Sequence, residues 1–159
     1  MLGTTLLFLL IMLLWVARPV ARSLIIFSHL VVGLVLLGGL MWLLNIELNT
    51  INFVAFPIIL GTGIDCFIHF GLRYDESGNM VEAINDKLPT IMVSNFTTII
   101  GFGGLLFIPS AGLRSLGLTA LLGLIIMTAL CTLVYPRVLY LYHKNGDSAV
   151  EFSKEPCRA

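Results

Sequence analysis

Two ionisable side chains interrupt a long apolar segment of the sequence. Asp65 lies eight residues before Arg73, which marks the end of this segment, and His69 follows Asp65 by four residues. At 1.5 Å per residue of helix, Asp65 would lie about 12 Å inside the membrane boundary. A charged carboxylate at that depth costs at least about 2.5 kcal/mol, so its neutral form is favoured and its proton can be exchanged. A spacing of four residues puts the carboxyl and imidazole groups on one face of a helix. This arrangement predicts that the two groups pass a proton along a path through the membrane.

The next long apolar segment carries the polar groups that could serve this path. Counted from its basic end, Thr97 and Thr98 lie at about the depth of Asp65, and Asn95 lies at about the depth of His69. Hydroxyl groups relay protons and hydrogen-bond either form of a carboxylate. We therefore expect Asp65, His69, Thr97 and Thr98 to form a proton-coupling group.

Structural roles for the same residues stay open. An intramembrane aspartic acid can remain neutral and hydrogen-bonded in a helix interface, and His69 can be a structural histidine. Threonines in membrane helices often bond the carbonyl four residues back in their own helix. His29, on another apolar segment, is interpreted as structural.

Small residues flank the polar group on both apolar segments. They are Pro57, Gly61 and Gly63 before Asp65, and Gly101 and Gly104 after the threonines. Small residues let membrane helices approach closely, and proline or glycine also makes a helix locally deformable. These positions therefore predict either close helix packing or a hinge.

Composition identifies the environment in which these residues work. The chain has 159 residues, of which 58% are hydrophobic and 11% charged, with a mean hydropathy of +1.00. Soluble domains carry about 25% charged residues, so a soluble monomer is excluded. A net charge of zero argues against nucleic acid as a partner, and three cysteines without a CxxC spacing give no metal site or disulfide framework. The composition is typical of an integral membrane protein.

Five apolar segments predict an all-α, multi-pass membrane bundle with five transmembrane helices. They cover residues 3–17, 24–44, 51–74, 91–108 and 116–141. The first segment also resembles a signal peptide, although no basic residues precede it and no convincing cleavage site follows. Residues 1–144 are expected to form the membrane domain. Residues 145–159 are polar and are expected to form a disordered cytoplasmic tail.

The connection between the third and fourth segments has a pattern of its own. Met80, Ile84 and Leu88 recur every four residues, and Asn79 with Glu82 resembles a capping box. The pattern predicts a short amphipathic helix on the cytoplasmic membrane surface, either as a plain connector or as a mobile coupling element.

Basic residues predict the orientation in the membrane. Six of them, Arg18, Arg22, Arg73, Lys87, Arg137 and Lys144, fall on one side of the five segments, against Arg114 on the other. The positive-inside rule then places the N-terminus outside the cell and the C-terminus in the cytoplasm, with the protein in the cell (inner) membrane.

The order of these motifs resembles a known superfamily. Residues 48–57, followed by Gly61-Thr-Gly-Ile-Asp65, His69 and Arg73-Tyr74, look like the fourth transmembrane helix of resistance–nodulation–division (RND) permeases. Residues 94–102 resemble the next helix of that superfamily, and residues 115–136 the one after. The likeness is to the MMPL-type and hopanoid-transporter-like branches, and it covers residues 1–144. Cys66 departs from the pattern, because many relatives have a second Asp or a Tyr at this position.

The resemblance implies a function. It identifies the chain with the five-helix, sterol-sensing-domain-like block of an RND protein, from the C-terminal half, without the extracytoplasmic domains. The residue corresponding to Asp65 takes part in proton translocation that drives export of lipids or other hydrophobic compounds. We therefore expect a non-enzymatic exporter subunit that uses protons as coupling ion, has no cofactor, and contacts membrane lipids, a hydrophobic substrate and either a second RND half or a second copy. A sterol-sensing-like module that binds lipid or a partner protein, and an inactive fragment of a larger transporter, remain alternatives.

Overall fold

The fold is a bundle of antiparallel helices in a computed structural model that describes residues 2–16, 20–46 and 49–142. The main helices are α1 (Leu2–Val16), α2 (Val20–Leu43), α3 (Ala55–Ser77), α4 (Met80–Gly104) and α5 (Ala111–Ala129). Short turns of 3₁₀ helix, η1 (Asn52–Val54) and η2 (Leu105–Phe107), precede α3 and follow α4, and a π-helical segment, η3 (Leu130–Val134), extends α5. No strand occurs in the described residues, which confirms the all-α class.

Four of these helical stretches are long and apolar enough to cross a membrane. They are Val20–Leu43, Asn52–Ser77, Met80–Phe107 and Ala111–Tyr142. The described part of α1 has 15 residues, about 22 Å of helix, which is shorter than a hydrocarbon core of about 30 Å. The structure therefore supports a multi-pass membrane bundle, with four candidate spans and a shorter helix in place of the expected five spans.

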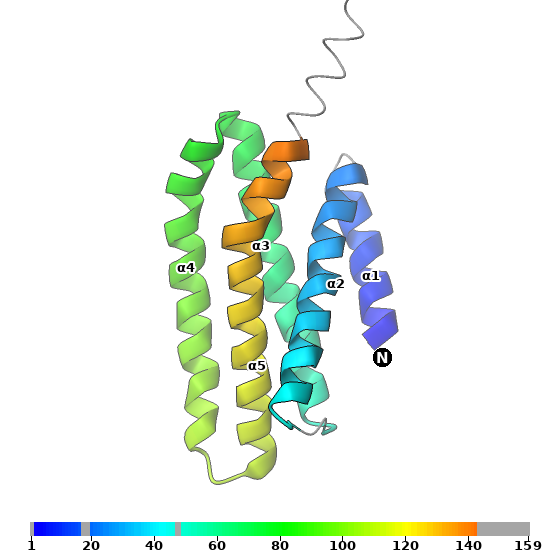
Figure 1. The fold of residues 1–159 in the computed structure, drawn as a ribbon, viewed down its shortest axis with the longest axis vertical. Helices are drawn as coiled ribbons and strands as arrows, with labels where there is room; N and C mark the ends of the chain where they lie inside the picture. Colours follow the sequence, from blue (N-terminus) through cyan, green and yellow to red (C-terminus); the bar gives the residue numbers. More distant parts are fainter. Residues whose placement is uncertain (1, 17–19, 47–48, 143–159) are drawn as a thin grey trace, which may run out of the picture.

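The α3–α4 turn, the start of α2 and the end of the α5 extension lie at the same end of the bundle, which we call the turn end (Figure 1). Arg22, near the start of α2, pairs there with Asp75, near the end of α3. Arg73 and Lys87 belong to the two helices that the turn joins. Basic residues from separate parts of the sequence thus gather at one end of the bundle.

The expected surface helix between the third and fourth segments is not a separate element. Residue 80 already belongs to α4, which runs without interruption to Gly104 and includes Pro89. Gly78, with a φ of 63°, makes the tight turn, and the Asn79 side chain accepts a hydrogen bond of 3.0 Å from the backbone N–H of Val81. The prediction of a separate amphipathic helix is therefore wrong: the turn and the cap are complete by residue 79, so the helix starts there. Pro89 removes one backbone donor, and the carbonyl that loses its partner belongs to the exposed Asn85, where it can be solvated.

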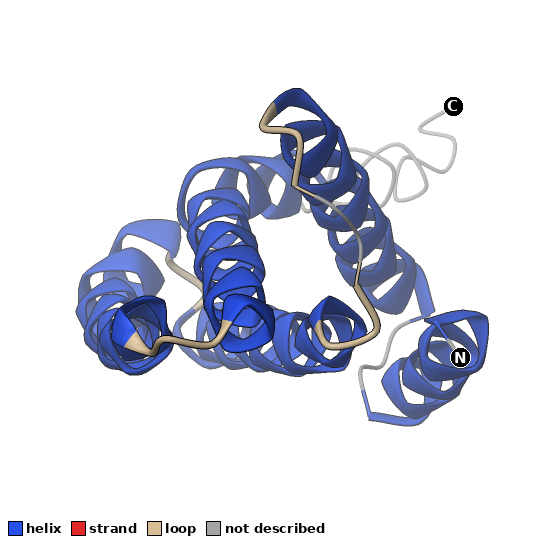
Figure 2. Cartoon of the chain, turned by 90° about the horizontal axis from the view of Figure 1, so that it is seen from below, coloured by secondary structure: helices blue, strands red, loops and turns tan. Residues whose placement is uncertain are grey.

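The core of the bundle lies between α2, α3 and the α5 extension. Tyr135 makes edge-on contacts with Phe67 and Phe70, with ring centroids 5.0 and 5.9 Å apart, and the three side chains are completely buried. By contrast, the buried residues of α4 are Ala83, Ile91 and Asn95 alone. Helices α1 and α4 lie at opposite edges of the bundle (Figures 1 and 2). Helix α4 thus packs against the core through a narrow stripe and leaves one side of the α3–α4 contact open.

A buried ion pair joins α2 to α3 at the turn end. Arg22 is 6% exposed, and its two terminal nitrogens each donate to one carboxylate oxygen of Asp75, the Nη2–Oδ1 distance being 2.6 Å. Two parallel bonds match the planar guanidinium to the carboxylate. This pair fixes the ends of two helices that are 53 residues apart in the sequence.

Candidate functional site

A polar pocket of about 350 Å³ lies between α3 and α4. From α3 it is lined by Thr62, Asp65, Cys66 and His69, and from α4 by Lys87, Thr90, Ile91, Ser94, Asn95 and Thr98. The α3 residues recur at spacings of three and four, so they occupy one face of a helix. The pocket is therefore formed where a polar face of α3 meets a polar face of α4, whose residues are mostly exposed.

The structure brings Asp65 and His69 together on the wall of this pocket. Asp65 lies near the midpoint of α3 (Ala55–Ser77), and His69 lies one turn nearer the turn end. Both side chains are exposed at the surface of the chain, and neither makes a hydrogen bond or ion pair with another described residue. A carboxyl group that is open to the pocket can gain or lose a proton without first breaking a contact inside the chain.

The two threonines separate in the structure. Thr98 lines the pocket, whereas Thr97 is exposed and does not belong to the pocket wall. Each hydroxyl donates to the carbonyl four residues back, Thr97 to Val93 at 2.9 Å and Thr98 to Ser94 at 3.1 Å. The geometry therefore groups Thr98 with Asp65 and leaves Thr97 apart from them.

The contacts of Asn95 show how far α4 is shifted along its axis relative to α3. Its side chain contacts the Cys66 thiol, with an Nδ2–Sγ distance of 3.4 Å and an Oδ1–Sγ distance of 3.6 Å. Asn95 thus lies beside the residue that follows Asp65, and not at the level of His69 as depth counting predicted. The difference is about one helical turn, because α4 starts directly after a tight turn and not at residue 91.

The orientation of the Asn95 amide follows from its second neighbour. Asn95 Nδ2 donates to Thr128 Oγ1 at 2.8 Å, and that hydroxyl donates its own proton to the Leu124 carbonyl at 2.7 Å. A hydroxyl whose proton is used in this way can only accept. The NH₂ group must therefore face Thr128, and the amide oxygen of Asn95 remains an acceptor on the side of Cys66.

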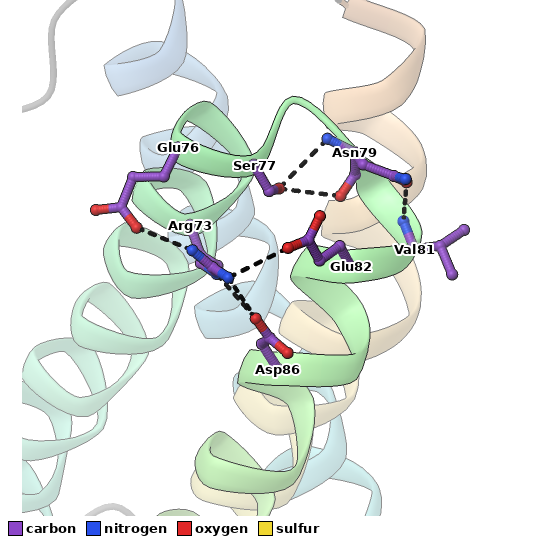
Figure 3. Close-up of polar contacts among 7 residues, drawn as sticks. All are labelled: Arg73, Glu76, Ser77, Asn79, Val81, Glu82 and Asp86. Carbon is purple, nitrogen blue, oxygen red and sulfur yellow. Dashed lines mark hydrogen bonds and ion pairs between the residues drawn. The ribbon is translucent and has the colours of Figure 1, made fainter.

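The turn end of the pocket carries a network of charges (Figure 3). Arg73 contacts Glu76 at 3.4 Å within α3, and Glu82 at 3.5 Å and Asp86 at 2.5 Å across the turn on α4. The neighbouring Lys87 lines the pocket and makes no ion pair or hydrogen bond in the described part of the chain. Apart from His69, the pocket thus has one acidic and one basic side chain of its own, Asp65 and Lys87.

The predicted packing and hinge positions fall in different environments. A Cβ at Gly63 would lie 3.2 Å from Leu30 and 3.4 Å from Met127, so Gly63 lies at a close helix contact. At Gly61, Gly101 and Gly104 a Cβ would have no neighbour within 4 Å among the described residues. Close helix packing at those three positions is therefore not seen in the described part of the chain.

Pro57 does not interrupt the third apolar helix. It is the third residue of α3, where its missing N–H costs no hydrogen bond of the helix. Pro57 therefore marks the start of the helix, and a kink in its interior is not observed there.

His29 lies away from the pocket. It is buried on α2, its Nδ1 is 2.7 Å from the carbonyl oxygen of Ile25, and its ring lies 5.7 Å from the rings of both Phe67 and Tyr135. These contacts fit the structural interpretation of this histidine.

Sequence reasoning missed five of the nine polar residues on the pocket wall, namely Thr62, Cys66, Lys87, Thr90 and Ser94. A usable signal existed, because polar residues recur at helical spacing on α3 (62, 65, 69) and on α4 (87, 90, 94, 98). No group of three or more His, Cys, Asp or Glu side chains in the described residues could hold a metal ion.

The fold and this site define a helical membrane protein with a polar pocket between two candidate spans, and two curated proteins are similar to the chain. The membrane protein MJ1562 of Methanocaldococcus jannaschii is 26% identical over 145 residues, which cover 86% of this chain and 37% of that protein. The hopanoid transporter HpnN of Burkholderia multivorans is 27% identical over 155 residues, which cover 92% of this chain and 18% of that protein.

These two similarities support a transporter-like family of membrane proteins. The chain spans less than two fifths of the length of either relative. No family model matches the sequence, and no solved structure is significantly similar to it.

Proposed function

We propose that this chain is the transmembrane part of an RND-type exporter of the MMPL or hopanoid-transporter-like kind, driven by the proton-motive force. The observation that carries the proposal is the position of Asp65. Its carboxyl group lies near the middle of a candidate membrane span and opens into a polar pocket between α3 and α4. Intramembrane carboxyl groups that face a polar cavity are typical of proton relays. The similarity to a hopanoid transporter supports lipids or other hydrophobic compounds as the substrate class.

Protonation of Asp65 would act on the contact between α3 and α4. The charged carboxylate favours polar neighbours and water in the pocket, whereas the neutral acid tolerates closer approach of the two helices. His69, one turn nearer the turn end, would pass the proton between Asp65 and that end of the bundle, and Thr98 would accept a hydrogen bond from the neutral acid. Helix α4 could respond because few of its residues are buried against the rest of the bundle.

The exposure of Asp65 also supports a partner. A charged side chain at mid-membrane rarely faces lipid, yet Asp65 and His69 are exposed at the surface of this chain. A second RND half or a second copy of the chain would cover this face and complete the pocket. Gly61 and Gly101, where an added Cβ would meet no described residue within 4 Å, offer small surfaces for such a contact.

The orientation belongs to the same proposal. Arg22, Arg73 and Lys87 all belong to the turn end of the bundle, and the positive-inside rule would place this end in the cytoplasm. The N-terminus would then be extracytoplasmic, the C-terminus cytoplasmic, and the location the cell inner membrane.

The direct test is proton flux in proteoliposomes that contain the full chain together with any subunits that co-purify with it. Asp65→Asn removes the titratable group with little change in volume, so proton flux should be lost while membrane insertion is retained. Thr97→Val is a matched control on the exposed side of α4 and should conduct protons like the native chain. Full proton flux in the Asp65→Asn protein would overturn the proposed mechanism.

A lipid- or partner-binding module of the sterol-sensing kind is the second candidate. The open space around Gly61 and Gly101 is the observation that favours it. In that case bulky substitutions at these glycines would abolish binding of lipid or partner, while Asp65→Asn would have little effect.

A further inference from the structure

Four oxygen-bearing side chains line the deep end of the pocket. Thr62 and Asp65 are three residues apart on α3, and Asn95 and Thr98 are three residues apart on α4. The contact between Cys66 and Asn95 sets the alignment of the two helices, so the four residues fall within about one helical turn along the bundle. Oxygen-bearing side chains from two helices thus line this end of the pocket.

The hydrogen bonds of these residues determine what the deep end can bind. Thr62 donates its proton to the carbonyls of Ile58 and Ile59, at 3.0 and 3.1 Å, and Thr98 donates to Ser94. Because both hydroxyl protons are used in these bonds, the two oxygens can act only as acceptors toward the pocket.

Asn95 and Asp65 add further acceptors. The Asn95 NH₂ group donates to Thr128, and both ends of the amide lie near the Cys66 sulfur, Nδ2 at 3.4 Å and Oδ1 at 3.6 Å. The amide oxygen has two lone pairs, so it remains an acceptor beside this contact. An ionised Asp65 is also acceptor-only. The deep end therefore offers acceptors from four residues and no free donor among them.

A site made of acceptors selects a cation. Carboxylate, hydroxyl and amide oxygens are the ligands of hard cations, and water in the open pocket can complete the coordination. One carboxylate balances one positive charge. A divalent ion would leave a net positive charge at the site, which is unfavourable inside a membrane.

We propose that Thr62, Asp65, Asn95 and Thr98 form a site for Na⁺, which competes with the proton at Asp65. This inference rests on the proposed function, because it keeps Asp65 as the coupling residue and adds a second ion that the same carboxylate exchanges. The titratable side chains that line the pocket with Asp65 are Cys66 and His69 from α3 and Lys87 from α4, and none of the lining residues comes from α2 or α5. Arg73, one turn beyond His69, is occupied by Glu76, Glu82 and Asp86.

A hydrophobic carbodiimide tests the site without any transport assay. This reagent modifies protonated carboxyl groups in membranes, and peptide mapping by mass spectrometry distinguishes Asp65 from the carboxylates near the turn. In proteoliposomes at constant pH and ionic strength, Na⁺ at about ten times its dissociation constant should reduce labelling of Asp65 about tenfold, by simple competition. A bulky organic cation at the same concentration should not protect.

Variants separate the ligand set from the carboxyl group itself. The double variant Thr62→Val/Thr98→Val removes two oxygens at nearly constant volume, so Asp65 should still be labelled but should no longer be protected by Na⁺. Thr98→Ser retains the hydroxyl and should retain most of the protection. Binding of radioactive sodium to the purified full chain, measured in parallel, should be lost in Asp65→Asn.

The outcomes distinguish the site from the proposed function. Labelling that falls with rising pH but is unaffected by Na⁺ would overturn the sodium site and leave proton coupling in place. Labelling that responds neither to pH nor to Na⁺ would overturn both the sodium site and proton coupling at Asp65. If the carbodiimide does not reach Asp65, the sodium-binding measurement decides: absence of bound sodium overturns the site, and binding that requires Asp65 and the two threonines supports it.

Discussion

Asn95 on α4 contacts Cys66 on α3 through both ends of its amide, at 3.4 and 3.6 Å, and is itself 6% exposed. Its NH₂ group also donates to Thr128, so one side chain connects three helices. This contact sets the level at which the polar faces of α3 and α4 meet. The composition of the pocket, with Thr98 near Thr62 at one end and Lys87 beyond His69 at the other, depends on that level.

The Asn95 contacts should stabilise the bundle measurably. Asn95→Leu keeps the volume but removes the interhelical hydrogen bond to Thr128. Such bonds contribute about 0.6 kcal/mol on average in membrane proteins and up to about 2 kcal/mol, so we expect a loss of about 1 kcal/mol in the free energy of unfolding. Reversible unfolding in mixed detergent micelles measures it. Ser94→Ala is the matched control, because Ser94 is exposed and makes no side-chain hydrogen bond in the described residues; equal stability of the two variants would contradict the prediction.

Two arginines at the turn end should differ strongly in their contributions. Arg22 is buried and forms two bonds to Asp75, whereas the partners of Arg73 are about half exposed. Breaking a buried pair costs about 3–5 kcal/mol, and Arg22→Ala should lie near the low end of this range because Asp75 is 37% exposed. Arg73→Ala should cost much less than Arg22→Ala, because exposed ion pairs contribute little to stability.

The same unfolding measurement compares the two arginine variants. Arg22→Lys serves as a third variant, which keeps the charge but loses the planar, two-bond geometry. It should lie between the native chain and Arg22→Ala. An Arg73→Ala variant that is less stable than Arg22→Ala would show that the network on the turn, and not the α2–α3 pair, holds this end of the bundle.

The sequence was sufficient to predict a helical membrane bundle and the polar pair Asp65 and His69 on one face of α3. Apolar segments and helical spacing are local properties, and they survive in the folded chain. The position of α4 along its axis relative to α3 was not predictable in this way, because it depends on where the α3–α4 turn ends. Asn79 starts the helix at residue 80 and Pro89 does not stop it, so counting from residue 90 placed Asn95 about one turn away from its position beside Cys66.

Long-range pairs could not be predicted for a different reason. Nothing in the local pattern indicates that Arg22 will bond Asp75 rather than lie at the membrane surface, since the two residues are 53 positions apart. The close helix contacts made at glycines could not all be predicted from the local sequence either. Gly63 is a predicted packing position because it precedes Asp65. Gly123, on α5, lies against Ile59, and no motif beside it in the sequence indicates that contact.

Glycines on α3 and α5 should respond differently to alanine. A Cβ at Gly123 would overlap the side chain of the fully buried Ile59, whereas a Cβ at Gly61 would have no neighbour within 4 Å. Gly123→Ala should therefore destabilise the chain by about 1–3 kcal/mol through overpacking. Gly61→Ala should be neutral or stabilising by about 0.5–1 kcal/mol, because alanine is favoured in a helix interior.

Relief of the clash provides the check on this explanation. Ile59→Val shortens the side chain that Gly123→Ala would meet, so the double variant should recover part of the lost stability. Additive losses in the double variant would mean that the cost comes from elsewhere in the helix contact.

Lys87 should control the charge of the pocket from its turn end. It lies eight residues from Asn95 along α4, about 12 Å in a helix, and it has no ion-pair partner in the described part of the chain. At that distance and an effective dielectric constant of about 20, a unit charge changes the energy of a cation near Asp65 by about 1.4 kcal/mol before screening by salt.

Removal of this charge should make the pocket more favourable for cations. Lys87→Gln should lower the sodium concentration needed for half-maximal protection of Asp65 by about threefold to tenfold, since 1.4 kcal/mol corresponds to a factor of ten and salt reduces it. Lys87→Arg, which keeps the charge, should behave like the native chain. If Lys87→Gln left the protection by sodium unchanged, Lys87 would act at the membrane surface and not on the ions that reach Asp65.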